Sequence, residues 1–274
     1  MTRANIVTVV GAFVVACGST TAWSQAVETK DTPAVAMPAA SGGPVEIYQA
    51  LGGPLYDNGP FVTHPGVCSA AADASRLQDN LGLTIFGFGA AVSSGFRVAD
   101  DFVVPAPGWV ANQLIVYTYQ TGSTPGSPTI TDVRIQIWNG PPNAGGTIVF
   151  GDTTTNRFVS AAFSNAYRDL GTQTCPAAQT RPIMAVTASI GTTLAPGTYW
   201  VDYQIGGTLA SGPWVVPTTI LGETDGCAGP ALCNAIQWNG TAWAQLLDTT
   251  INQDAKFAIE GVLTPVELQS FEIK

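Results

Sequence analysis

The fold class is decided by the stretch TDVRIQIWNG at residues 131–140. Within it, Val133, Ile135 and Ile137 alternate with polar side chains and with Trp138. Successive side chains of a β-strand point to opposite faces, so this alternation predicts a strand with one face buried and the other turned outward. The Asn-Gly pair that closes the stretch is a strong signal for a tight turn.

The same pattern recurs along the chain. In residues 198–206 every second side chain is apolar or aromatic, and residues 234–246 have the pattern of a complete hairpin around an Asn-Gly turn. Further strands are predicted at residues 83–88, 96–104, 113–120, 147–150, 182–190, 214–220 and 256–262, and a short helix at residues 71–78. Many short strands joined by Gly- and Pro-bearing turns predict an all-β chain, folded as a single antiparallel β-sandwich with a jelly-roll-like arrangement.

The charge of the chain narrows the choice of partner. Ten Lys and Arg against 19 Asp and Glu give a formal net charge of −9 at pH 7. A nucleic-acid-binding surface needs clustered basic side chains to displace counterions, and an anionic membrane surface attracts the same side chains. The basic residues are spread along the sequence, so no nucleic acid is expected as a partner. Neutral ligands such as glycans, or divalent cations, suit this charge better.

The N-terminus has the features of an export signal. A positive start precedes an apolar or small run at residues 6–16, and cleavage is expected after Ser24 or Ala26. The run is too short to span a bilayer, and no other segment of the sequence has the length and hydrophobicity of a transmembrane segment. In an alternative reading, Cys17 ends a lipobox-like Val-Val-Ala-Cys and carries a lipid anchor.

These features divide the chain into four parts. We predict a signal peptide at residues 1–26, a flexible leader at 27–54, a β-sandwich domain at 55–263 and a C-terminal tail at 264–274. The leader is rich in Pro, Ala, Gly and Ser and has no period, which is typical of a flexible segment. The expected location is secreted, periplasmic or at the cell surface.

The cysteines support export. Four remain when Cys17 is set aside, and an even number in an oxidising compartment favours disulfides. Cys227 and Cys233 enclose a loop that contains Gly and Pro, so we predict the pairs Cys227–Cys233 and Cys68–Cys175. A zinc site is the alternative, but the sequence lacks C-x2-C spacing and a second His.

The sequence contains no recognisable catalytic motif, and we predict no catalytic residue. The one histidine, His64, is followed by Pro-Gly, which favours a loop residue. Asp100 and Asp101 are adjacent, so on a regular strand they point to opposite faces. The carboxylate that faces the core needs a partner, which is Arg97, a turn of backbone N–H groups that braces a loop, or a calcium ion. No other cofactor is expected.

Two tryptophans supply the best binding hypothesis. Trp138 and Trp200 are predicted to project away from the buried side chains of their strands. Their polar neighbours are Arg134 and Gln136 on one strand and Asp202 and Gln204 on the other. A planar indole flanked by amide and carboxylate groups is suited to stack against a sugar ring. In the alternative, both indoles are covered by a loop or lie at a strand end, because large aromatic side chains are buried on average.

Several motifs carry a resemblance to a known family. They are LYDNGP at residues 55–60, RVADDFVVP at 97–105, IQIWNGPPNAGG at 135–146 and LAPGTYWV at 194–201. Over residues 55–262 the chain resembles an uncharacterised family of secreted bacterial β-sandwich proteins, which implies the fold and the export but no activity. The segment TPVELQSF at 264–271 is similar to segments that precede C-terminal sorting or anchoring tails.

Together, these features predict an exported, non-catalytic extracellular or cell-surface protein that binds a glycan or another surface polymer. The alternative, of a different class, is a structural or adhesive component that self-associates through an edge strand or through the leader. A carboxylate-based hydrolase is the least favoured reading.

Overall fold

The computed structural model describes residues 25–30, 54–170, 175, 179–227 and 233–265. Its regular elements are strands and three short 3-10 helices, so the chain is all-β as predicted. The strands are β1 (Val27–Thr29), β2 (Pro54–Asp57), β3 (Asp73–Leu77), β4 (Ile85–Gly89), β5 (Arg97–Val104), β6 (Trp109–Tyr119), β7 (Ile130–Trp138), β8 (Ile148–Gly151), β9 (Phe158–Leu170), β10 (Pro182–Leu194), β11 (Gly197–Gly207), β12 (Trp214–Val215), β13 (Ile236–Trp238), β14 (Trp243–Gln245), β15 (Leu247–Asp248), β16 (Ile251–Asn252) and β17 (Phe257–Leu263). The 3-10 helices are η1 (Ser69–Ala71), η2 (Asp79–Leu81) and η3 (Val92–Ser94).

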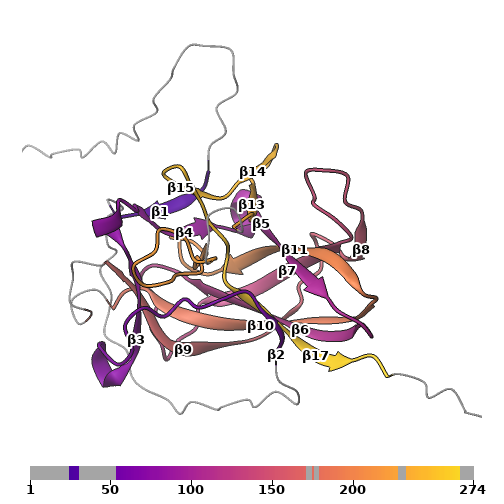
Figure 1. Cartoon of the computed structure of the whole chain (residues 1–274). Helices are drawn as coiled ribbons and strands as arrows, with labels where there is room; N and C mark the ends of the chain where they lie inside the picture. The colour runs from indigo at the N-terminus through magenta and orange to yellow at the C-terminus, as the bar shows by residue number, and fades with distance from the viewer. Residues whose placement is uncertain (1–24, 31–53, 171–174, 176–178, 228–232, 266–274) are drawn as a thin grey trace, which may run out of the picture.

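Two large sheets form a sandwich (Figure 1). The nine-stranded sheet contains the order β2-β17-β6-β10, and the six-stranded sheet contains the order β5-β11-β7-β8. The chain passes from one sheet to the other between β5 and β6, between β6 and β7, and between β10 and β11. Two four-stranded sheets in this order are the framework of a jelly roll, so the predicted sandwich is confirmed.

The core lies between these sheets. Val133, Ile135 and Ile137 of β7 are completely buried, as their alternation predicts. They pack in one cluster with side chains of the opposite sheet, including Val116 and Val186. Burying each such side chain contributes about 1.5–3 kcal/mol, which makes this shared layer the main source of stability.

Further strands extend the framework at its edges. β9 lies beside β10, and β3 lies beside β9 as the one parallel pair among the described strands. The prediction of a helix at residues 71–78 is therefore wrong. Ala74 and Leu77 are buried against β9 and its surroundings, and this tertiary packing outweighs the local helix propensity of alanine.

Both disulfides have the connectivity expected from the sequence. Cys68–Cys175 joins the segment before β3 to the segment after β9, and Cys227–Cys233 closes a short loop before β13. No helix in the described ranges is long and apolar enough to cross a membrane.

Part of the predicted flexible leader belongs to the sheet. Val27–Thr29 form β1, which pairs with β4 at the edge of the nine-stranded sheet. The predicted lipidation site at Cys17, the remaining leader from residue 31 to residue 53 and the tail from residue 266 onward lie outside the described residues.

Candidate functional site

The five predicted ligand residues lie on the outer face of the six-stranded sheet. Trp138 is paired with Trp200 across β7 and β11, and Gln136 is paired with Asp202 in the same ladder. Gln204 follows two residues later on β11 and so points to the same side. The structure thus brings these residues together as cross-strand neighbours.

The expected exposure of Trp200 is wrong. Trp200 is only 6% exposed, because it packs with Ala99, Ile236 and Trp243 in a small apolar cluster. Ile236 comes from β13, which joins the sheet beside β5 and places its side chain on the same outer face. Trp138 is half-buried at the margin of this cluster. Trp200 therefore offers no free ring face to a ligand.

Arg97 is a central side chain of this face and contacts Gln136 and Asp202, whereas the sequence suggested it only as a partner of Asp100 or Asp101. Its Cζ lies 5.3 Å from the ring centre of Trp238 and 4.8 Å from that of Trp243. The two indoles are paired across the β13–β14 hairpin. Nη1 of Arg97 also donates to Oε1 of Gln136 at 3.1 Å and lies 3.5 Å from Oδ2 of Asp202. Arg97 therefore links the hairpin to β7 and β11.

Asp202 is buried beneath these side chains, with 1% of its surface exposed. Nε1 of Trp138 donates to its Oδ2 at 3.3 Å, while its Oδ1 has no hydrogen-bond partner within the described part of the chain. Burial raises the pKa of Asp202 to about 7, although Arg97 and Trp138 act in the opposite direction. The charge beneath the aromatic face therefore changes near neutral pH.

We expect Asp202→Asn to make the slope of the free energy of unfolding against pH less negative between pH 4.5 and 6.5 than it is in the wild type. Because the pKa of Asp202 rises from 3.8 to about 7 on folding, the folded state keeps a proton in this window that the unfolded state has released. Its contribution is fully present below pH 3.8 and is lost as the pH rises towards 7. One such group gives a slope of about 1.4 kcal/mol per pH unit.

Urea unfolding of the wild type and the variant at several pH values between 4.5 and 6.5, inside the window set by these two pKa values, measures the two slopes. A slope that is less negative in the wild type than in Asp202→Asn, or an equal one, would contradict the assignment. The comparison between proteins cancels the contributions of other buried carboxyl groups, such as Asp254, whose pKa is raised mainly by burial to about 6.

A shallow cleft of about 270 Å³ opens beside the Arg97 cluster. It is lined by Val92, Gly95, Arg97, Arg134, Thr153, Gln204 and Trp238. Arg134 is held by Asp132 at 3.0 Å and by the Thr153 carbonyl oxygen, which accepts from Nη1 at 3.1 Å. The Gln204 amide donates to the Phe96 carbonyl oxygen at 3.3 Å. The cleft therefore places an indole, two guanidinium groups and an amide around one small volume.

Asp100 and Asp101 do not come together as metal ligands. They occupy successive positions in an uninterrupted ladder between β5 and β11, so their side chains point to opposite faces. Asp100 accepts hydrogen bonds from the backbone N–H groups of Asp101 and Ala255 and from the Asn58 amide, at 2.9, 3.3 and 3.1 Å. These donors satisfy a buried carboxyl group without a cation, so Asp100 braces the loop before β17.

The buried carboxyl groups do not form the accessible acid–base pair that the hydrolase alternative requires. Burial and the nearby Asp254 raise the pKa of Asp100 well above its ordinary value. Asp254 itself accepts backbone N–H groups of Asn234 and Ala235 at 2.8 and 3.1 Å. Asp100 is 1% exposed, so a substrate bond has no access to it. His64 forms a backbone bridge with Ala74, which is a structural position.

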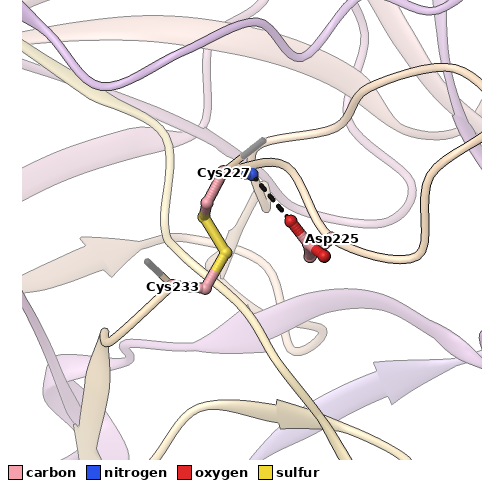
Figure 2. Close-up of side chains that lie close together, drawn as sticks. All are labelled: Asp225, Cys227 and Cys233. Atoms are coloured by element: carbon pink, nitrogen blue, oxygen red, sulfur yellow. Dashed lines mark hydrogen bonds between the residues drawn. A yellow bond between two sulfur atoms is a disulfide. The ribbon is translucent and has the colours of Figure 1, made fainter. Parts of the chain in front are cut away.

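A second group contains cysteines. Figure 2 shows Asp225, Cys227 and Cys233, whose potential ligand atoms lie within 4.8 Å of one another. The two sulfur atoms are joined as a disulfide, whereas a metal ion needs thiolates. Oδ1 of Asp225 accepts a hydrogen bond from the Cys227 backbone N–H at 3.1 Å. In this oxidised form the group braces the disulfide loop and does not offer a metal site.

Three side chains of the cleft were not predicted as ligand-binding residues from the sequence: Arg97, Arg134 and Trp238. The alternation of β7 identifies Arg134 as a neighbour of the predicted site, because it lies on the same strand face as Gln136 and Trp138. Arg97 lies on the outer face of β5 together with Ala99, and Trp238 reaches the cleft only because β13 pairs with β5. That pairing has no local signal in the sequence.

Comparison of the chain with protein-family models, with curated proteins and with solved structures gave no match in any of the three. The family resemblance therefore stays a prediction.

Proposed function

We propose that the protein is an exported, non-catalytic binding protein that holds one sugar unit of a glycan in the cleft between Arg97, Arg134 and Trp238. The observation that carries the proposal is the composition of this cleft, a half-buried indole beside two guanidinium groups and an amide. An indole face packs against the C–H groups of a sugar ring, while guanidinium and amide groups donate to its oxygens.

The placement of these side chains favours binding. Arg97 and Gln204 belong to paired strands and Arg134 to the next strand, so the donors are held by a hydrogen-bonded sheet. Arg97 is further fixed by its two indole neighbours. Side chains that are already ordered lose little conformational freedom when a ligand binds, which leaves more of the contact energy for affinity.

The disulfides support an oxidising compartment, and the charge bears on the class of ligand. Structural disulfides form and persist in oxidising compartments such as the periplasm and the cell exterior, and the chain has two. The net charge of −9 disfavours polyanions over the protein as a whole. A neutral glycan of the cell surface or the surroundings is therefore the preferred ligand class.

We expect Trp238→Ala to weaken glycan binding by about tenfold, the equivalent of about 1.4 kcal/mol for a lost aromatic contact. Trp238→Phe retains a ring face and is expected to keep most of the affinity. The ligand is first found on an array of neutral glycans, and its affinity is then measured by titration calorimetry. Leu221→Ala, at a side chain that is 59% exposed and does not line the cleft, is the control.

An array without any bound glycan would overturn the proposal. So would a Trp238→Ala protein that is folded by circular dichroism and binds as tightly as the wild type. Equal losses in Trp238→Ala and Leu221→Ala would place the ligand elsewhere.

Self-association is the second candidate function, and the edge strand β8 favours it. β8 is the last strand of the six-stranded sheet, and its residues Ile148 and Val149 are each 46% exposed. An edge strand presents backbone N–H and C=O groups that a strand of a second copy pairs with. Sedimentation velocity at increasing concentration separates the two candidates, because a protein that stays monomeric throughout excludes assembly through β8.

A further inference from the structure

Residues 25–29 are anchored to the domain by specific contacts. The Gln25 side-chain amide donates to the Leu247 carbonyl oxygen at 2.9 Å and accepts from the Leu247 N–H at 3.1 Å. The Ala26 N–H donates to Oε1 of Gln237 at 2.8 Å, and Nε2 of Gln237 donates back to the Ala26 carbonyl oxygen at 2.9 Å. Both residues before β1 are thus fixed to the domain by paired hydrogen bonds between a side-chain amide and the backbone.

The nine-stranded sheet is shaped to receive Ala26. A Cβ atom at Gly89 would lie 2.7 Å from Cβ of Ala26, a distance that real Cβ contacts do not reach. The Gly89 N–H donates to the Ala26 carbonyl oxygen at 2.5 Å. The glycine at position 89 therefore makes room for residue 26, which explains one of the two glycines in the Gly-Phe-Gly sequence of β4.

Glu28 completes the attachment. Its carboxylate is completely buried and accepts hydrogen bonds from the Tyr119 and Thr121 hydroxyl groups and from Nε of Arg181. A buried carboxylate is stable only when its partners are in place, and the same holds for the buried Arg181. Removing residues 25–29 would therefore leave Arg181 buried without its carboxylate partner and would destabilise the domain.

These contacts distinguish between the two cleavage positions of the predicted export signal. Signal peptidase requires small residues at the last and third-last positions before the cut. Ala22 and Ser24 meet this requirement for cleavage after Ser24, and Ser24 and Ala26 meet it for cleavage after Ala26. The second cut would remove Gln25 and Ala26 together with all their hydrogen bonds, whereas the first leaves the anchored segment whole.

We infer that signal peptidase cleaves between Ser24 and Gln25, and that residues 25–29 of the mature chain are a structural part of the domain. The cleavage hydrolyses one peptide bond: the oxygen of water bonds to the carbonyl carbon of Ser24 and completes its carboxylate, and the released amine of Gln25 takes up a proton to become an ammonium group. The inference rests on the export that belongs to the proposed function, but not on glycan binding.

Intact mass and N-terminal sequencing of the exported protein test this inference. The full chain is expressed with its own N-terminus in a bacterial host and is recovered from the periplasm or the medium. We expect a chain that begins at Gln25, as such or in its cyclised form. A chain that begins at Val27, or at a lipid-modified Cys17, overturns the inference. An unprocessed chain confined to the cytoplasm overturns the proposed export as well.

Two matched variants sharpen the test. Ala22→Leu removes the small residue that the cut after Ser24 requires and leaves the cut after Ala26 intact, so the chain that begins at Gln25 is expected to disappear and to be replaced by precursor or by a chain that begins at Val27. Cys17→Ser removes the lipidation site and is expected to leave processing unchanged. Wild-type amounts of a Gln25 chain from Ala22→Leu, or a block of processing in Cys17→Ser, overturn the inference.

Discussion

Replacement of Glu28 by Ala is expected to destabilise the domain by at least about 5 kcal/mol. Removing one partner of a buried ion pair leaves the other charge uncompensated, at a cost of about 3–5 kcal/mol, and here Arg181 is only 6% exposed at its side chain. The hydroxyl groups of Tyr119 and Thr121 lose their acceptor at the same time. A typical domain is stable by about 5–15 kcal/mol, so the variant is expected to lie close to its unfolding threshold.

Urea unfolding of the mature chain measures this loss. Lys30→Ala, at an exposed side chain that immediately follows β1, is the control and is expected to change stability by less than about 0.5 kcal/mol. The double variant Glu28→Ala with Arg181→Ala is expected to lose less than the sum of the two single variants, because it leaves no unpaired charge. A loss of less than about 1 kcal/mol in Glu28→Ala, within the range of an ordinary surface pair, would show that β1 does not hold the domain together.

Loss of the Cys68–Cys175 disulfide is expected to cost about 5 kcal/mol, because a crosslink over a long loop removes much chain entropy from the unfolded state. The two cysteines are separated by 107 residues, whereas Cys227 and Cys233 are separated by six. The same model gives about 2 kcal/mol for a loop that short. Cys68→Ala with Cys175→Ala is therefore expected to be the more damaging pair.

Denaturant unfolding of both double variants under oxidising conditions provides the comparison. Each variant loses one crosslink and retains the other, so each serves as the control for the other. Cys68 and Cys175 also lie in a small buried cluster with Tyr167, so their removal leaves a cavity that adds to the loss. Equal losses, or a greater loss for the short loop, would contradict the entropic argument.

Alternation predicts the central strands and their faces well. In β7 and β11 the inward face is mostly apolar or aromatic, so alternation predicts that Gln136 and Asp202 both point outward. β9 has no such regularity. It changes register beside β10, and Asn165 within it has a φ of 60°, so its side chains do not keep to a period of two.

The parts of the site that depend on distant segments were not accessible to sequence reasoning. The burial of Trp200 is decided by Ile236 and Trp243, which reach it through the pairing of β13 with β5. The same pairing brings Trp238 over Arg97. A periodic pattern gives the side to which a residue points, but not which remote strand lies beside it.

The position of β17 has a consequence for the order of events during biosynthesis. The last strand of the domain lies between β2 and β6, in the interior of the larger sheet and not at its rim. Until Phe257–Leu263 have left the ribosome, β2 and β6 lack the strand that pairs with both of them. The apolar side chains that β17 covers then stay exposed. A chain arranged in this way completes its larger sheet only after its final strand has been synthesised.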